Sequence, residues 1–140
     1  MLVEYEGTAY FGFQWQKGLP TIQGELEEAV WKVTEQRVRV RGAGRTDAGV
    51  HAKGQVASFD CESRLSAPDM VRALNAHLPV DIAVRAACEV DKEFDPRRDA
   101  LSREYRYTIL SASSRSALWA RRAYWLPLQL NTTAMNRACE

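Results

Sequence analysis

Apolar and polar residues follow regular patterns in the first third of the chain, and three elements are predicted from them. Residues 1–6 alternate between apolar and polar, as expected of a strand. Apolar side chains then recur at helical spacing, so residues 21–35 are predicted to form an amphipathic helix with Thr21 as its N-cap. Residues 37–42 alternate again, with valines on one face and arginines on the other, which predicts a second strand.

The rest of the chain predicts further strands and two more helices. Ser66 and Asp69 fit a capping box, so a helix is expected to begin there and to end before Pro79. Asn131 or Thr132 is a candidate N-cap for a last helix that the chain end cuts off. Alternation predicts strands over residues 55–60, 81–90, 102–110 and 123–128.

The order of these elements is β-α-β-β-α-β, followed by additional strands. It is typical of the split βαβ arrangement, in which an antiparallel sheet carries two helices on one face. The sequence therefore predicts an α+β fold of the ferredoxin-like or RNP-like kind. RNA-recognition domains share this topology, but the fold alone does not define a function.

Composition is that of an ordinary globular protein, with 46% hydrophobic and 26% charged residues, so a core can form without disulfides or a structural metal. No run approaches the roughly 18 apolar residues of a membrane span. Glu4 and Glu6 stand where a signal peptide would be basic, so a cytoplasmic location is expected. Cys61, Cys88 and Cys139 are far apart and include no CxxC pair, which favours reduced thiols over a zinc site.

Net charge is only +1, but the arginines are unevenly distributed. Residues 37–47 contain four arginines and one acid, and residues 93–125 contain seven arginines and four acids. A locally basic surface of this kind is able to bind phosphate groups. Charge runs are nevertheless more often solvated faces of a fold, so the pattern alone does not predict nucleic-acid binding.

The segment 42–54 carries the most chemical information. It reads GAGRTDAGVHAKG and joins two predicted strands, although a hairpin needs only about two to five residues to turn. Asp47 is its only acid, and Arg45 nearby favours the ionised carboxylate that acts as a nucleophile or a base. A second interpretation stays open, namely a glycine-rich turn in which the Asp47 side chain bonds to its own backbone.

The string GRTDAGVHA, residues 44–52, resembles the signature loop of the A-type tRNA pseudouridine synthases almost residue for residue. Other segments resemble the same family in the same order along the chain. They are VEYEGTAYFGFQWQ (3–16), TIQGELEEAV (21–30), LNAHLPVDIAV (74–84) and FDPRRDALSREYRYTIL (94–110). The resemblance therefore covers nearly the whole chain and implies a pseudouridine synthase fold.

The resemblance also implies an activity and its residues. Family members isomerise uridine to pseudouridine at positions 38, 39 and 40 of the tRNA anticodon stem-loop, with no cofactor or metal. Asp47 matches the catalytic aspartate, which acts as a nucleophile at C1′ or C6 or as the base that forms a glycal. Tyr105 matches the active-site tyrosine, suited to stack on a flipped uracil, although by itself it suggests an exposed strand residue beside Tyr107. Arg45 matches the motif arginine, which would hold Asp47 ionised, contact a phosphate or fill the space that the base leaves.

Several other residues are candidates for RNA contacts. His51 is expected to shape the loop or contact RNA rather than to act as an acid or base. The aromatic residues of the segment 10–15 either stack on RNA or pack in the core. The arginines that would suit phosphate groups are Arg37, Arg39, Arg41, Arg97, Arg98, Arg103 and Arg106.

Family members are about twice as long as this chain, form homodimers and carry a second domain of similar fold. Residues 1–112 are therefore predicted to be the catalytic N-terminal domain and residues 113–140 the start of a truncated second domain, so that the chain is a fragment of the enzyme. Two rival hypotheses are a non-catalytic RNA-binding module and a structural ferredoxin-like domain that binds another protein. The second leaves the 42–54 loop unexplained.

Overall fold

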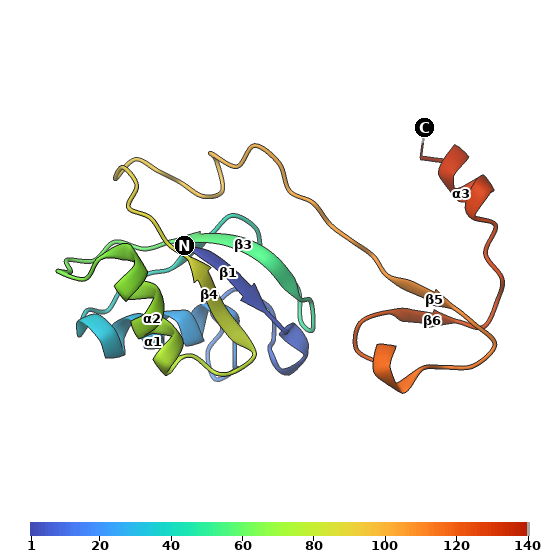
Figure 1. The fold of residues 1–140 in the computed structure, drawn as a ribbon, viewed down its shortest axis with the longest axis horizontal. Coiled ribbons are helices and arrows are strands. Elements are labelled where there is room, and N and C mark those ends of the chain that lie inside the picture. Colours follow the sequence, from blue (N-terminus) through green and yellow to red (C-terminus); the bar gives the residue numbers. More distant parts are fainter. Residues whose placement is uncertain (140) are drawn as a thin grey trace. The chain divides into compact units, whose positions relative to one another are not determined.

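The computed structural model describes residues 1–139, which form two compact units, Met1–Arg103 and a second that begins at Glu104 (Figure 1). The first unit has the predicted order β-α-β-β-α-β, with a 3₁₀ turn after the first strand. Its elements are β1 (Leu2–Tyr5), α1 (Ile22–Thr34), β2 (Arg41–Gly42), β3 (Ala52–Ser58), α2 (Ala67–His77) and β4 (Ile82–Ala86).

The four strands form one antiparallel sheet in the order β2-β3-β1-β4. β1 is central, and its Val3 pairs with Gln55 of β3 on one side and with Val84 of β4 on the other. The first strand therefore lies between the third and the fourth, which is the arrangement expected of a split βαβ fold. The predicted ferredoxin-like class is confirmed.

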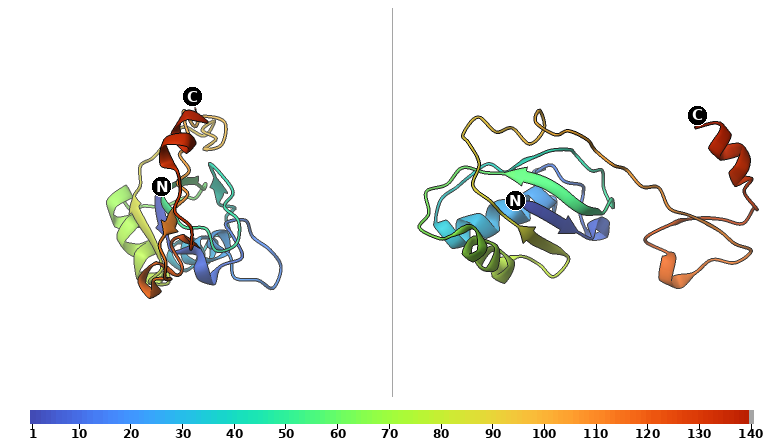
Figure 2. Two further views of the ribbon diagram at one scale, coloured as in Figure 1. Left: turned by 90° about the vertical axis from the view of Figure 1, so that its right-hand side faces the viewer. Right: turned by 45° about the horizontal axis from the view of Figure 1, so that its top comes forward.

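The core lies between one face of this sheet and the two helices. Alternate residues of β1 and β4, such as Val3 and Val84, are buried in a single cluster with Leu26 of α1 and Leu74 of α2. Leu2, which points to the other face, keeps 38% of its surface exposed. Both helices therefore cover the same face, as predicted, and they run alongside each other (Figures 1 and 2).

Both helices begin where their capping residues indicate. Thr21 caps α1 by accepting a hydrogen bond of 3.2 Å from the Gly24 amide. Ser66 caps α2 in the same way through the Asp69 amide, at 3.3 Å. α1 ends at Thr34, and the left-handed backbone of the next residue, Glu35 (φ 59°), stops the helix.

The predicted strand over 37–42 is wrong except at its end, because only Arg41 and Gly42 pair with β3. The backbone groups of Val40 form hydrogen bonds with side chains of α1 instead of with a strand. The Val40 amide donates to Oε1 of Glu27 at 3.0 Å, and its carbonyl accepts from Nε2 of Gln23 at 2.9 Å. Val40 is nevertheless buried and Arg41 exposed, as the alternation predicts.

Three other predicted strands have different lengths in the structure. β4 ends at Ala86 rather than at residue 90, because its partner β1 begins at Leu2, opposite Ala86. β3 begins three residues before the predicted start, because β1 continues the pairing as far as Ala52. Residues 102–108 are not a strand, since they find no strand partner among residues 1–139, and only the end of that prediction is realised, in β5 (Ile109–Ser111).

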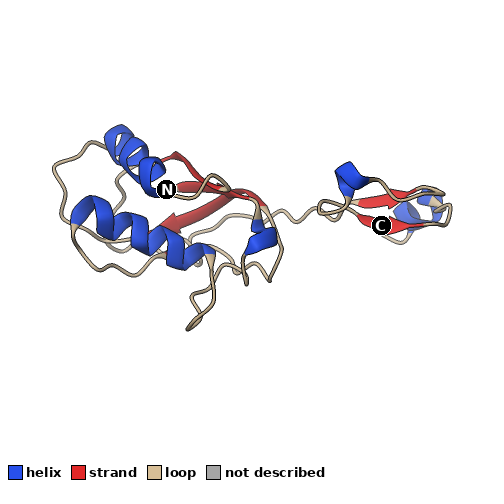
Figure 3. Ribbon diagram, turned by 90° about the horizontal axis from the view of Figure 1, so that it is seen from below, coloured by secondary structure: helices blue, strands red, loops and turns tan. Residues whose placement is uncertain are grey.

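The second unit contains β5, β6 (Tyr124–Leu126) and α3 (Thr132–Arg137), which follow a stretch without helix or strand over residues 87–108 (Figure 3). β5 and β6 pair in parallel, so the predicted strand near 123–128 is confirmed. The predicted cap of the last helix is also confirmed, because Asn131 accepts a hydrogen bond of 2.9 Å from the Ala134 amide. None of the residues 104–139 is fully buried, so this unit has no core of its own.

Candidate active site

The loop that joins β2 to β3, residues 43–51, carries the residues singled out by the sequence. Its first residues are held against β3. The Ala43 amide donates to the Val56 carbonyl at 2.8 Å. The side chain of Gln55 accepts from the Gly44 amide at 3.2 Å and donates to the Gly44 carbonyl at 2.7 Å. The loop therefore leaves the sheet in a fixed direction.

A second segment, which follows β1, binds the middle of the loop through its backbone. The Phe13 amide donates to the Thr46 carbonyl at 2.9 Å, and the Gly49 amide donates to the Tyr10 carbonyl at 3.2 Å. These two bonds lie on either side of Asp47 in the chain. The backbone that carries Asp47 is therefore fixed from both directions.

Two glycines allow this close approach. A Cβ atom on Gly7 would lie 2.0 Å from the Val50 carbonyl oxygen, and one on Gly12 would lie 2.6 Å from the Thr46 carbonyl oxygen. Gly12 also has a φ of +89°, a conformation that other residues adopt only with strain. The two segments can therefore touch only because side chains are absent at these positions.

Asp47 itself lies near the middle of the loop and is exposed. Its carbonyl accepts a hydrogen bond of 3.2 Å from the Val50 amide, which closes a turn with Gly49 at a φ of +79°. Among residues 1–139, the Asp47 carboxylate forms no hydrogen bond and no ion pair, including none to its own backbone. The glycine-rich turn is therefore present, but the expected bond from the Asp47 side chain to its own backbone is not, and the carboxylate is open to solvent.

Two other loop residues flank this carboxylate in the sequence. The Arg45 side chain is exposed and makes no ion pair with Asp47 within the described part of the chain. His51 uses Nδ1 to accept a hydrogen bond of 3.0 Å from the Gly7 amide, which requires that nitrogen to be unprotonated. The same atom lies 3.5 Å from Oε1 of Glu6. This contact supports the loop-shaping role expected for His51.

A family model described as tRNA pseudouridine synthase matches residues 1–98 of the chain, which include the whole of this loop. The chain belongs to this family. Curated relatives named tRNA pseudouridine synthase A agree with the match. The protein from Caldicellulosiruptor bescii is 44% identical over 140 residues, covering all of this chain and 57% of the relative. Those from Sinorhizobium fredii and Geobacter sp. are 45% and 46% identical, with 58% and 56% of their lengths covered. The chain thus spans little more than half the length of these pseudouridine synthases.

The aromatic residues near the start of the chain divide between core and surface. Tyr10 and Phe13 are buried, and the Tyr10 hydroxyl donates to Oδ1 of Asp81 at 2.6 Å. Burial and the neighbouring Asp81 raise the pKa of Tyr10 well above its usual value. Phe11 and Trp15 keep 50% and 46% of their surface exposed. The core interpretation therefore holds for Tyr10 and Phe13, and RNA stacking stays a prediction for Phe11 and Trp15.

The three arginines before the loop pair with acids. Arg37 lies 3.2 Å from Glu28, Arg39 lies 3.7 Å from Glu27 and Arg41 lies 3.1 Å from Asp60. Such exposed pairs are weak, typically less than about 1 kcal/mol, so phosphate contact by these arginines stays a prediction. Arg97 is exposed, and Arg103 donates to two backbone carbonyls.

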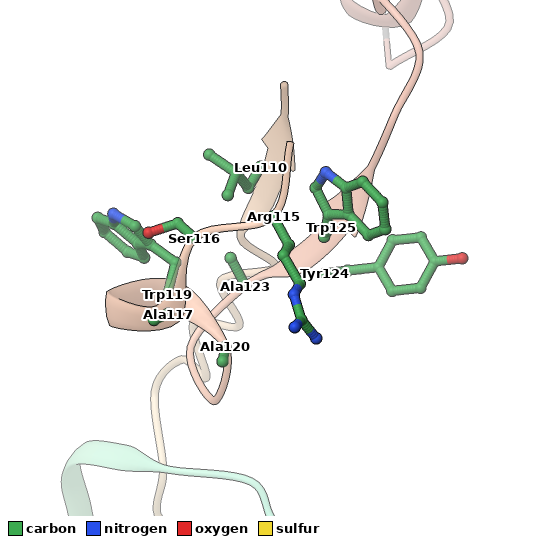
Figure 4. Close-up of a pocket in the computed structure, with 9 residues that line it drawn as sticks. All are labelled: Leu110, Arg115, Ser116, Ala117, Trp119, Ala120, Ala123, Tyr124 and Trp125. Atoms are coloured by element: carbon green, nitrogen blue, oxygen red, sulfur yellow. The ribbon is translucent and has the colours of Figure 1, made fainter. Parts of the chain in front are cut away.

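Tyr105, expected in the active site of a pseudouridine synthase, belongs to the second unit, where 75% of its surface is exposed. The second unit also has an open hollow, with Leu110 and the side chains of Trp119 and Trp125 around it (Figure 4). None of the predicted site residues lines that hollow. The structure thus brings Arg45, Asp47 and His51 together on one loop, and the place of Tyr105 in the same site stays a prediction.

Two features are absent from residues 1–139. No cluster of three or more His, Cys, Asp or Glu side chains is arranged to hold a metal ion. None of the described helices combines the length and hydrophobicity that crossing a bilayer requires.

Sequence reasoning missed two residues that support the loop. Gln55 is a buried polar residue in an otherwise alternating strand, and Tyr5 ends β1 with its hydroxyl beside Thr46. A buried polar side chain needs a hydrogen-bond partner, so a glutamine in this strand indicated that some nearby group would bond to it. The sequence did not indicate that this partner is Gly44.

Proposed function

We propose that this chain is the catalytic part of a tRNA pseudouridine synthase, with Asp47 as the residue that acts on the target uridine. The observation that carries the proposal is the placement of Asp47. Its loop is held on either side of it, because the Phe13 amide donates to the Thr46 carbonyl and the Gly49 amide donates to the Tyr10 carbonyl. Its carboxylate is exposed and unpaired within residues 1–139. A group held in this way is ready to meet a substrate without reorganisation of the loop.

The reaction rearranges one nucleotide without adding or removing atoms. The bond between N1 of uracil and C1′ of ribose breaks, the uracil rotates, and C5 bonds to C1′. C5 then loses its proton and N1 gains one, so neither an oxidant nor a second substrate is required. An ionised Asp47 serves such a reaction as a nucleophile at C1′ or C6, or as the base that removes a ribose proton to form a glycal.

The substrate is proposed to be tRNA, with uridines 38, 39 and 40 of the anticodon stem-loop as targets. A uridine in a stem must leave the helix before the carboxylate reaches it, and Tyr105 offers a ring on which the base stacks. Arg45 is exposed on the same loop as Asp47, so it is available for a phosphate or for the space left by the flipped base. The full-length protein is proposed to be a homodimer, as the family resemblance implies.

The test is pseudouridine formation in a tRNA with uridines at these positions. Because the chain spans about half of its relatives, the assay uses the 140-residue chain and a full-length relative, each as wild type and as Asp47→Asn or its equivalent. The matched control is Asp91→Asn, another exposed aspartate without a side-chain partner among residues 1–139. We expect Asp47→Asn to reduce the rate by about a thousandfold or more, and the control to have no effect.

Two results would overturn the proposal. The first is an Asp47→Asn variant with near-normal activity, which would remove the aspartate from the chemistry. The second is wild-type protein that binds tRNA but leaves these uridines unmodified, which would favour the RNA-binding-module hypothesis. Unaltered thermal unfolding of Asp47→Asn is expected, since the exposed carboxylate makes no contact in the described structure.

A further inference from the structure

Arg103 makes contacts that differ from those expected of a phosphate-binding arginine. Its Nε donates to the carbonyl of Ala43 at 3.1 Å, and its Nη2 donates to the carbonyl of Arg97. Among residues 1–139 it forms no ion pair with an acid. Both of its bonds therefore connect backbone groups from parts of the chain that are far apart in sequence.

One of these carbonyls belongs to Ala43, the first residue of the loop that carries Asp47. Ala43 is buried, its amide donates to Val56, and the next residue, Gly44, is held on both of its backbone groups by Gln55. The bond from Arg103 satisfies the carbonyl that lies between these anchors. The loop's first two residues are thereby fixed by a strand, a buried amide side chain and Arg103.

The other carbonyl belongs to a turn that is itself well defined. The Asp95 carboxylate accepts hydrogen bonds from the amides of Arg97 and Arg98, at 2.8 and 3.1 Å, and these bonds lower its pKa. Asp95 and Asp99 also bond to each other through their backbone and side chain, and Pro96 is fully buried. Since the turn is held in place, the Arg97 carbonyl is a fixed point for Arg103.

We propose that Arg103 is a positioning residue that braces the entrance of the Asp47 loop against the 95–99 turn, and that its guanidinium does not contact RNA phosphate. The importance of this brace for catalysis rests on the function proposed above. The brace itself does not, because it is a property of the folded chain without RNA.

Replacing Arg103 by lysine distinguishes a brace from a phosphate contact, because the two cations differ in shape. A guanidinium is a planar fork whose Nε and Nη2 donate to two acceptors at once, whereas the lysine ammonium is a compact point charge. Lysine at position 103 would keep the attraction to a phosphate but would not span the two carbonyls. Arg103→Lys is therefore expected to behave as a loss of function if Arg103 is a brace, and as a mild change if it is a phosphate contact.

The first measurement is hydrogen exchange in the 140-residue chain without RNA, for wild type, Arg103→Lys and Arg97→Lys. Arg97 is the control because its exposed guanidinium has no partner among residues 1–139. We expect amides of residues 43–50 to exchange about tenfold faster in Arg103→Lys, with no change in Arg97→Lys. Wild-type exchange of this loop in Arg103→Lys would overturn the proposal, whether or not the protein makes pseudouridine.

The second measurement uses tRNA and the equivalent substitutions in a full-length relative. A brace predicts that Arg103→Lys lowers kcat by about tenfold or more, while KM and the salt dependence of tRNA binding stay at their wild-type values. A phosphate contact predicts instead that Arg103→Lys keeps its kcat, and that Arg103→Gln raises KM and lowers the salt slope by about one. This second pattern would also overturn the proposal.

Discussion

The hydroxyl of Tyr5 lies 2.8 Å from Oγ1 of Thr46, which connects the end of the central strand to the residue immediately before Asp47. Tyr5 is only 3% exposed, and its ring lies 6.4 Å from that of Phe13. Burial raises the pKa of Tyr5 above its usual value, which favours the protonated hydroxyl. The Tyr5 side chain therefore connects the hydrophobic core to the candidate catalytic loop.

Removing this hydroxyl should destabilise the fold. Tyr5→Phe is expected to lower the free energy of unfolding by about 1 kcal/mol, because one partly buried hydrogen bond is lost while the ring stays packed. Urea unfolding of Tyr5→Phe, Thr46→Val and the double variant measures the coupling between the two residues. The double variant should cost less than the sum of the single ones. Strict additivity would show that the bond contributes nothing.

A methyl group at Gly12 should be much more harmful than one at Gly18. Both glycines have positive φ, +89° and +75°, so alanine is strained at either position. A Cβ at Gly12 would also meet the Thr46 carbonyl at 2.6 Å, whereas one at Gly18 would have nothing within 4 Å. We expect Gly18→Ala to cost about 1 kcal/mol and Gly12→Ala at least about 2 kcal/mol more. Equal unfolding free energies for the two variants would argue against the tight approach of the two segments.

Local patterns were sufficient to predict α1 and α2, because Thr21 and Ser66 cap them and their periodic apolar residues face one core. Strand ends were less predictable, because a strand extends only as far as its partner. β4 ends where β1 begins, and the backbone of Val40 bonds to side chains of α1 rather than to another strand. Alternation within one segment contains no information about either partner.

The candidate site was also predicted only in part, as the fold was. The loop and Asp47 were found from the motif GRTDAGVHA. The supports of the loop come from Gln55 in the strand that follows, and from residues 5–13 and 103, which are distant in sequence. Arg103 illustrates the difference. Its charge suggested a phosphate contact, and only the structure shows the two carbonyls to which it donates.

Alkaline pH should weaken the fold through Tyr10. Burial, and then the hydrogen bond to Asp81, raise the pKa of Tyr10 above the usual value of 10.0. Its contribution to stability is therefore complete below the unfolded pKa and is lost as pH rises through the folded pKa, since the unfolded chain ionises first. The stability advantage of wild type over Tyr10→Phe should shrink between about pH 9 and pH 11.5 in urea unfolding. An advantage that is constant over this range would show that the Tyr10 pKa is unchanged by folding.

The side-chain amide of Gln55 should contribute more to the free energy of unfolding than that of an exposed glutamine. Gln55→Met leaves both the amide and the carbonyl of Gly44 without their partner, so we expect a loss of about 2 kcal/mol in unfolding free energy. Gln14→Met is the control, because Gln14 is exposed and has no hydrogen bond within the described residues. It should be nearly neutral. Similar losses for the two variants would mean that Gln55 does not support the loop.

The docking of Gly7 and Gly12 against the 43–51 loop also limits how the motif can be moved between proteins. A designer who grafts GRTDAGVHA onto another hairpin would transfer Asp47 without the backbone surface that holds Thr46 and Val50. The portable unit therefore includes at least residues 5–13 together with 43–55 at their native spacing, and Arg103 with the turn that it contacts.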